Sequence, residues 1–126
     1  MMKTILLSLV TSCLVAFWGM GQNLSSPIQN YSSYEYKAAS KNWGLAMDVD
    51  GELYIANNNG LLHYNGENWT LNKLPNKTIL RSVSFINNKI FTGSYEEFGF
   101  WQKDAYGSLQ YTSLTHLIKD HEFTNE

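Results

Sequence analysis

The sequence predicts an all-β protein made of β-propeller blades, which are four-stranded antiparallel sheets repeated along a chain. Short apolar strand patterns alternate with turns rich in Gly and Asn, and aromatic residues make up 14% of the 126 residues. The same order of strands, turns and aromatics occurs twice, and Ile90 follows its counterpart Leu53 by 37 residues. A four-stranded repeat of roughly 40 residues is typical of a propeller blade. Two such blades are therefore expected.

Composition excludes one class of partner. The formal net charge is -2 at pH 7, with 9 Lys and Arg residues against 11 Asp and Glu residues. A nucleic-acid-binding face needs clustered basic residues to neutralise phosphates. We therefore expect no nucleic acid to bind this segment.

Residues 1–21 are expected to be a secretory signal peptide. Lys3 precedes an apolar run at residues 5–18, and Gly19 and Gly21 follow at the spacing of a signal-peptidase site. The apolar run is too short for a comfortable membrane span. The remaining chain is therefore expected to be exported to the periplasm.

Cys13 is the only cysteine, and it lies within this segment. The letters V-T-S-C that end at Cys13 resemble a lipoprotein attachment box. The apolar run continues past Cys13, whereas a lipidated cysteine is normally followed by polar residues. We expect Cys13 to be removed with the signal peptide, and lipidation is the alternative.

A polar lead-in at residues 22–41 is expected to be extended, without a helix. Blade repeat 1 then occupies residues 42–78, with strands expected at residues 43–47, 52–56, 61–64 and 69–71. The dipeptides Asp-Gly at 50–51 and Asn-Gly at 65–66 favour tight hairpin turns, because Gly accepts a positive φ. Residues 57–60 are expected to form a polar tip between the second and third strands.

Blade repeat 2 occupies residues 79–117 and follows the same order. Its strands are expected at residues 80–85, 89–93, 98–101 and 109–112, with the equivalent tip at residues 94–97. Residues 118–126 are expected to begin a further, truncated repeat. Two blades cannot close a ring and leave outer faces and edges open. We therefore expect a fragment of a longer protein, with the remaining blades of that protein as partners.

The first repeat carries a recognisable motif. It reads D-x-D-G-x-L-Y-I-A-N-x-x-G-L over residues 48–61 and Y-N-G-x-x-W over residues 64–69. Together with R-S-V at 81–83 and F-T-G-S-Y-E-E-F-G-F-W at 91–101, it resembles the two-component regulator propeller family of Gram-negative bacterial sensors.

The resemblance implies a function. In that family a secreted propeller precedes a triple-tyrosine domain, a membrane helix and a signalling output, either a histidine kinase or a helix-turn-helix module. The resemblance implies that this chain is an extracytoplasmic ligand-sensing segment of a transmembrane signal-transduction regulator. The ligand in that family is often a carbohydrate. The segment is expected to have no output or enzymatic activity of its own. The alternatives are part of a secreted polysaccharide-acting propeller enzyme and a propeller interaction scaffold.

Ligand-binding residues are expected at the two equivalent tips. The candidates are polar or aromatic and occupy matching positions of the two repeats: Asn57, Asn58, Asn59, Tyr95 and Glu96. Such side chains can hydrogen-bond to a sugar and stack on it. The alternative is that the asparagines only tolerate the turn conformation.

Two acidic patterns do not predict a site. The neighbours Glu96 and Glu97 would point to opposite faces of an extended segment, so they are not expected to be a catalytic pair, and a solvated tip is expected instead. Asp48 and Asp50 resemble the start of a calcium loop, but the closing Glu is missing, and a hairpin turn fits better. No catalytic residue is predicted.

The histidines and the large aromatics are expected to be structural. His63, His116 and His121 are not at metal-binding spacing, so no metal site is predicted. The sequence has no Gly-rich phosphate loop, and no cofactor is predicted. Four large aromatics recur at blade positions and are expected to pack between blades: Trp43, Trp69, Trp101 and Tyr111.

Overall fold

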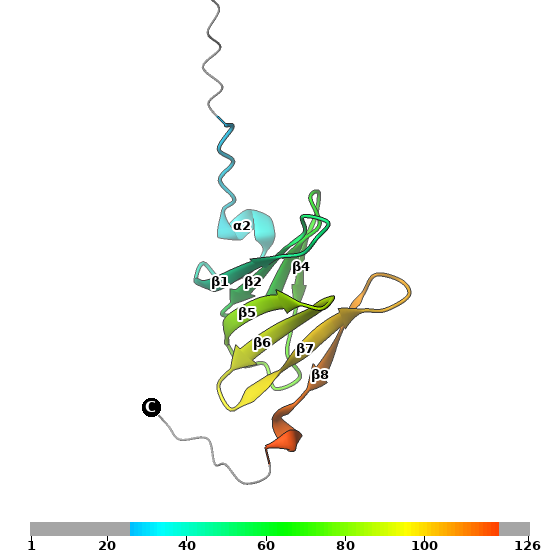
Figure 1. Cartoon of the computed structure of the whole chain (residues 1–126). Coiled ribbons are helices and arrows are strands. Elements are labelled where there is room, and N and C mark those ends of the chain that lie inside the picture. Colours follow the sequence, from blue (N-terminus) through cyan, green and yellow to red (C-terminus); the bar gives the residue numbers. More distant parts are fainter. Residues whose placement is uncertain (1–25, 119–126) are drawn as a thin grey trace, which may run out of the picture. The chain divides into compact units, whose positions relative to one another are not determined.

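Eight strands of four to seven residues follow one another in the computed structural model, which describes residues 26–118 (Figure 1). The described residues from Tyr31 on belong to one compact unit, and residues 26–30, in another unit, have no regular secondary structure. The predicted signal peptide and nearly all of the predicted third repeat lie outside the described residues.

The strands form two four-stranded antiparallel sheets, each in simple sequential order. The first sheet contains β1 (Asn42–Met47), β2 (Leu53–Asn57), β3 (Gly60–Tyr64) and β4 (Trp69–Asn72). The second contains β5 (Leu80–Ile86), β6 (Lys89–Ser94), β7 (Glu97–Lys103) and β8 (Leu109–Ser113). The all-β prediction is therefore confirmed, with each expected strand in place.

The turns are shorter than expected at the two tips. Asn57 pairs with Gly60, and Ser94 pairs with Glu97, so each tip is a two-residue turn and not a four-residue loop. The first tip needs a glycine, because Gly60 has a φ of 137°. The sequence predicts longer tips because polar residues and Gly, which are typical of loops, also occupy the flanking strand ends.

The lead-in contains a short helix, which corrects the expectation of an extended segment. Helix α2 (Ser33–Tyr36) starts at a capping box: the Glu35 amide donates to Ser32 Oγ at 3.4 Å, and the Ser32 amide donates to Glu35 Oε2 at 2.7 Å. Tyr36 is 7% exposed and packs on the Trp69 ring, with centroids 5.7 Å apart. This contact holds one turn of helix against the first sheet, although so short a helix is not stable alone.

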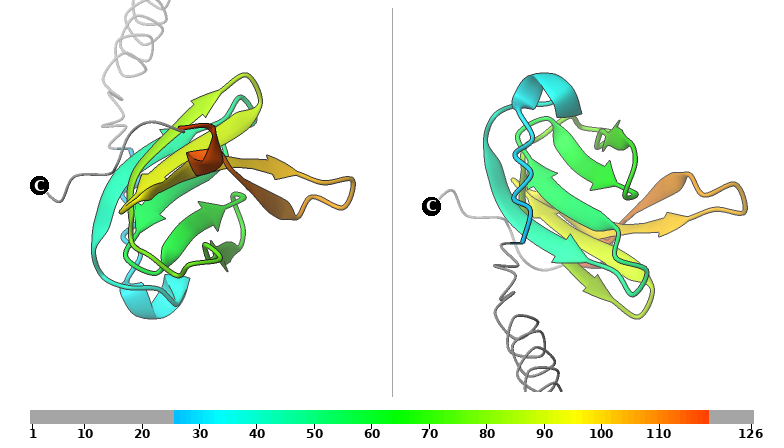
Figure 2. Two further views of the ribbon diagram at one scale, coloured as in Figure 1. Left: turned by 90° about the horizontal axis from the view of Figure 1, so that it is seen from below. Right: turned by 90° about the horizontal axis from the view of Figure 1, so that it is seen from above.

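The two sheets pack face to face. Strand β1 lies against β5 (Figure 1), and the core between the sheets contains residues of both and of their linker: Tyr54, Ala56, Leu61, Leu74, Leu80, Ile90 and Trp101. The Tyr54 and Phe85 rings lie parallel across this interface, with centroids 6.5 Å apart. The hairpin of β7 and β8 projects beyond the stacked region (Figure 2).

Each sheet has two faces, which strand register defines. Face A carries Tyr54 and Ala56 in the first sheet and their counterparts Phe91 and Gly93 in the second. Face B is the opposite side. It carries Leu45, Met47, Leu53 and Ile55 in the first sheet and Val83, Phe85, Ile90 and Thr92 in the second.

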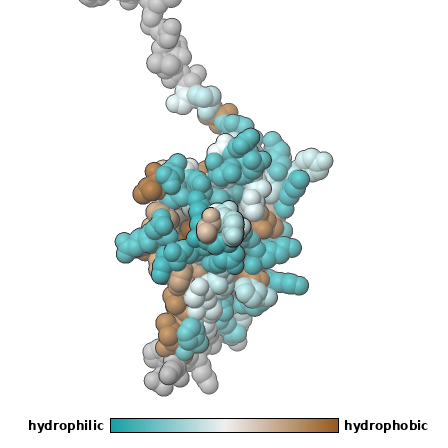
Figure 3. Space-filling model, turned by 90° about the vertical axis from the view of Figure 1, so that its right-hand side faces the viewer, coloured by the Kyte–Doolittle hydropathy of each residue, from teal (hydrophilic) through white to brown (hydrophobic). Residues whose placement is uncertain are grey.

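The packing is head to tail, because face A of the first sheet lies on face B of the second. Face A of the second sheet and part of face B of the first remain uncovered. The side of the molecule where β4 and β8 lie is mainly hydrophilic, with apolar residues along one border of the view (Figure 3).

Candidate functional site

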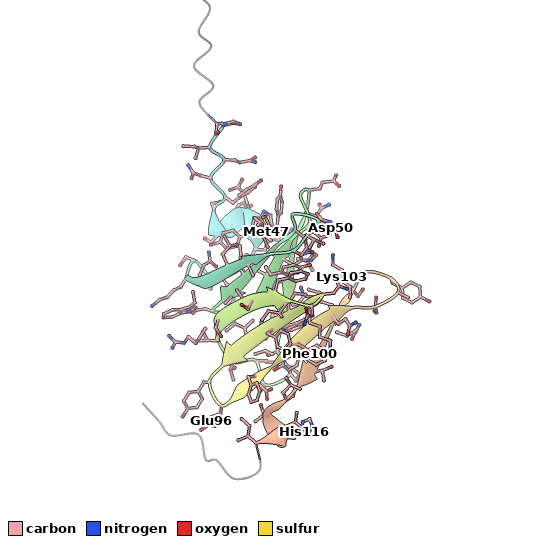
Figure 4. The ribbon with its side chains drawn as sticks, viewed as in Figure 1. Met47, Asp50, Glu96, Phe100, Lys103 and His116 are labelled. Carbon is pink, nitrogen blue, oxygen red and sulfur yellow. The ribbon has the colours of Figure 1, made fainter. Side chains whose placement is uncertain are left out.

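The stack has two ends with different side chains. The β2–β3 and β6–β7 turns form one end, here called the tip end, and the β1–β2 and β5–β6 turns lie at the other, the hairpin end. Glu96 and Asp50 mark these two ends (Figure 4). The five candidate residues all belong to the tip end.

Asn57 is buried and does not face solvent. Its exposed fraction is 0%, and Nδ2 donates to the Ala39 carbonyl at 2.6 Å and to Asn42 Oδ1 at 2.7 Å. Its Oδ1 accepts from the Asn59 amide at 2.9 Å. Asn57 therefore anchors the segment that precedes β1 and orders the β2–β3 turn.

Ser94 plays the same part in the second sheet. Its Oγ donates to the Ile79 carbonyl at 2.9 Å and hydrogen-bonds with Thr78 Oγ1. The residue that ends the second strand of each sheet thus anchors the chain that leads into the first strand.

The other tip residues are more accessible. Asn59 and Glu96 are exposed, and Tyr95 is 57% exposed. Asn58 is half-buried, and its Oδ1 accepts a hydrogen bond from Trp43 Nε1 at 2.7 Å. The described contacts do not bring the residues of the first tip against those of the second.

Two cations lie on Trp43, next to the first tip. Lys41 Nζ is 4.1 Å and the Arg81 guanidinium 4.0 Å from the Trp43 ring centroid. Trp43 is 37% exposed and lies at the edge of the sheet stack, not within the core. The contact between Arg81 and Trp43 was not predicted, because the two residues are far apart along the chain.

The other large aromatics divide into two groups. Trp101 is 3% exposed in the core, and Tyr111 packs against it with centroids 4.8 Å apart, as predicted for packing between sheets. Trp69 instead packs on face B of the first sheet with Tyr31, Tyr36 and Tyr64. Its expected place between sheets is wrong, because the lead-in covers it.

Glu97 is not a solvated tip residue, which corrects the sequence interpretation. Oε1 accepts from Tyr111 OH at 2.8 Å, Ser113 Oγ at 2.6 Å and Thr115 Oγ1 at 3.1 Å. Burial raises the pKa of Glu97, but these hydroxyl donors outweigh it, and the pKa lies below its usual value. Glu97 ties β8 and the 3₁₀ turn η1 (Thr115–Leu117) to β7.

The hairpin end holds a polar cluster that sequence reasoning did not find. Asp48 Oδ1 accepts from the Asp50 and Glu52 amides at 3.0 and 2.9 Å, which shapes the β1–β2 turn. Asp48 Oδ2 accepts from Tyr54 OH at 3.0 Å. Glu52 Oε2 accepts from Lys103 Nζ at 2.7 Å. The cluster therefore joins β7 to the first sheet.

His63 completes this cluster. Its Nε2 lies 2.5 Å from Glu52 Oε2, and its ring stacks on Tyr54 with centroids 4.9 Å apart. Burial raises the pKa of Glu52, but the hydrogen bonds from Lys103 and His63 reverse the effect and lower it. Burial, followed by the nearby carboxylates, raises the pKa of Tyr54, which stays a neutral donor.

A small cavity of about 210 Å³ adjoins the cluster. Residues of both sheets line it: Asp48, Asp50, Tyr54, Phe85, Asn88, Ile90 and Lys103. Sequence spacing could not reveal it, because the side chains come from segments up to 55 residues apart that only the stacking of the sheets brings together. Both carboxylate oxygens of Asp48 and Oε2 of Glu52 accept hydrogen bonds from protein donors, so the cluster joins the two sheets.

Within residues 26–118, no group of three or more His, Cys, Asp and Glu residues is arranged to hold a metal ion. His116 is exposed in η1, and His121 lies outside the described residues. The helices of the described part are all too short or too polar to cross a membrane.

Comparison with protein-family models, with curated proteins and with solved structures gives no match for this chain. The class of the protein is therefore defined by its fold alone: it is an all-β protein of two four-stranded antiparallel sheets, stacked head to tail.

Proposed function

We propose that the chain is a ligand-sensing β-propeller segment of a transmembrane signal-transduction regulator of the two-component type, acting in the periplasm. The observation that carries the proposal is the head-to-tail packing of face A on face B. Units that pack in this way add further units by the same contact, and a ring of such sheets is a propeller.

The repeat motif supports the same proposal. The resemblance to two-component regulator propellers rests on the D-x-D-G turn and on the tyrosine and tryptophan positions of the first repeat. The first Asp of that motif, Asp48, orders its turn through two backbone amides. In this proposal the segment itself performs no catalysis, and the membrane anchor and signalling output belong to other parts of a full-length protein.

The ligand site in this proposal is the tip end, and the ligand class is carbohydrate. Asn59 and Glu96 offer exposed polar groups, and Tyr95 offers a ring that can stack on a sugar. Asn58 orients the neighbouring Trp43 through a hydrogen bond. Asn57 positions the tip from beneath, without contacting the ligand.

Calorimetric titration with neutral and acidic oligosaccharides tests this proposal. The double variant Asn59→Ala with Tyr95→Ala should weaken binding of the tightest oligosaccharide by about tenfold or more. Tyr106→Ala is the matched control, because Tyr106 is 94% exposed and lies in the turn between β7 and β8, which is not one of the two tips. Absence of binding, or equal losses in both variants, would contradict the tip-end site. Cleavage of the oligosaccharide would favour the enzyme alternative.

A further inference from the structure

Face A of the second sheet is exposed, whereas the equivalent face of the first sheet is covered. Ser82 and Ser84 are exposed, and Phe91 and Phe98 beside them are only half-buried. A shallow hollow of about 330 Å³ lies over these residues. In the first sheet, the equivalent residues are covered by the second sheet, and Tyr54 and Ala56 are 0% exposed.

Face B of the first sheet is exposed along β1, where the equivalent strand of the second sheet makes the contact between the sheets. Leu45 and Met47 are 64% and 61% exposed, whereas their counterparts Val83 and Phe85 pack on the first sheet. A hollow of about 400 Å³ lies beside Leu45 and Ile55. Exposed apolar surface of this kind marks an interaction site.

From Tyr31 on, the lead-in covers a different part of face B. Tyr31 and Tyr36 cover Trp69, on the β4 side of the face. Within the chain, the second sheet contacts the first mainly through β5, and the equivalent strand of the first sheet is the open strand β1. The uncovered part of face B is thus the part that the internal contact uses.

Charged residues at the two exposed faces are also complementary. Within the chain, Glu52 on face A pairs with Lys103 of the other sheet at 2.7 Å. The position of Glu52 in the second repeat is Lys89, 37 residues on, and the position of Lys103 in the first is Gly66, next to the exposed Glu67. Lys89 thus has the opposite charge to Glu52, and the acidic Glu67 lies beside the position of Lys103, so Lys89 of one chain and Glu67 of another are the expected pair.

We propose that a second copy of this chain docks on these faces, with face B of its first sheet on face A of the second sheet. The inference goes beyond ligand sensing and does not depend on it. The contact joins unlike faces, so each dimer keeps one free face of each kind, and further copies extend it into a ring or a filament.

Two exposed-surface variants test the contact by sedimentation velocity at about 100 μM chain. The face-B variant carries Leu45→Glu and Met47→Glu, and the face-A variant carries Ser82→Glu and Ser84→Glu. Wild type should associate, with a mean mass that rises with concentration. Each variant alone should be monomeric, because each has lost one of the two faces.

The mixture of the two variants is the decisive sample. Each contributes the face that the other lacks, so native mass spectrometry should show a one-to-one heterodimer and nothing larger. Circular dichroism of each variant should match that of wild type, which separates a lost face from a lost fold. A monomeric wild type, a variant that still self-associates, or a mixture without heterodimer overturns the proposal.

Charge reversal tests the register of the contact. Lys89→Glu and Glu67→Lys should each weaken self-association by about tenfold, and the double variant should restore it. Lys73→Glu is the control, because Lys73 is exposed and lies in neither face. Equal losses in the double variant and the single ones would contradict the proposed pairing.

Discussion

The two sheets have the same strand order but differ in which side is buried. Face A of the first sheet holds Tyr54, which is fully buried and hydrogen-bonded to Asp48. The same face of the second sheet holds Phe91, which is half-buried, has no hydroxyl and packs beside Phe100 at 5.9 Å. The burial of a repeated position therefore depends on the neighbouring sheet and not on the repeat itself.

The largest expected effect compares these two aromatic residues. Tyr54→Ala should lower the free energy of unfolding by about 3–5 kcal/mol, because it opens a cavity and removes the hydroxyl that donates to Asp48 Oδ2. Phe91→Ala should cost about 1 kcal/mol in the isolated chain, since its face is open. Urea unfolding followed by fluorescence measures both, and equal losses would contradict the difference in burial.

The next effect compares the tip turns of the two sheets. A Cβ at Gly60 would collide with the Asn72 carbonyl oxygen, and its φ of 137° disfavours any other residue. Gly60→Ala should therefore cost about 2–4 kcal/mol. Glu97 holds the equivalent place in the second sheet with an ordinary side chain, and Glu97→Ala should cost less. The urea unfolding midpoints of the two variants measure this difference, and a lower midpoint for Glu97→Ala than for Gly60→Ala would contradict the prediction.

The dependence of the unfolding free energy on pH measures how much the Glu52 and Glu97 carboxylates contribute to stability. The pKa values of Glu52 and Glu97 are both lowered in the folded chain, so their stabilisation is complete above the unfolded value and is lost as pH falls through the folded value. Unfolding free energy should decline below a pH of about 4.3, the ordinary Glu pKa. Glu52→Gln should flatten this decline, as should Glu97→Gln. An unchanged slope in either variant would exclude that residue as a source.

The smallest effect concerns the β-hairpin turns. Gly51 accepts a φ of 85° in the first sheet, whereas Asn87 and Asn88 adopt φ values of 49° and 61° in the second. Asn88→Gly should stabilise the chain by about 0.5 kcal/mol, because Asn-Gly is the preferred turn pair. Gly51→Asn should destabilise it slightly. Thermal unfolding measures both shifts, and a lower midpoint for Asn88→Gly would contradict the expectation.

Local chemistry made most of the strands predictable. The Asp-Gly and Asn-Gly turns and the alternation along β2 marked the strand boundaries to within a few residues. The helix α2 was missed although Ser32 and Glu35 have capping-box spacing, because its stability comes from Tyr36 packing on Trp69. The polar cluster was missed because Glu52 and Lys103 are 51 residues apart.

By itself, the sequence determined the eight strands, their antiparallel order and the equivalence of the two repeats, because turn residues and a period of two are local properties. Tertiary structure decided which side of each sheet is core. An alternating pattern separates two faces without selecting the buried one, and burial requires a neighbour. Thus Asn57 points inward to the lead-in, Tyr54 is closed off by Phe85, and Leu45 stays at the surface.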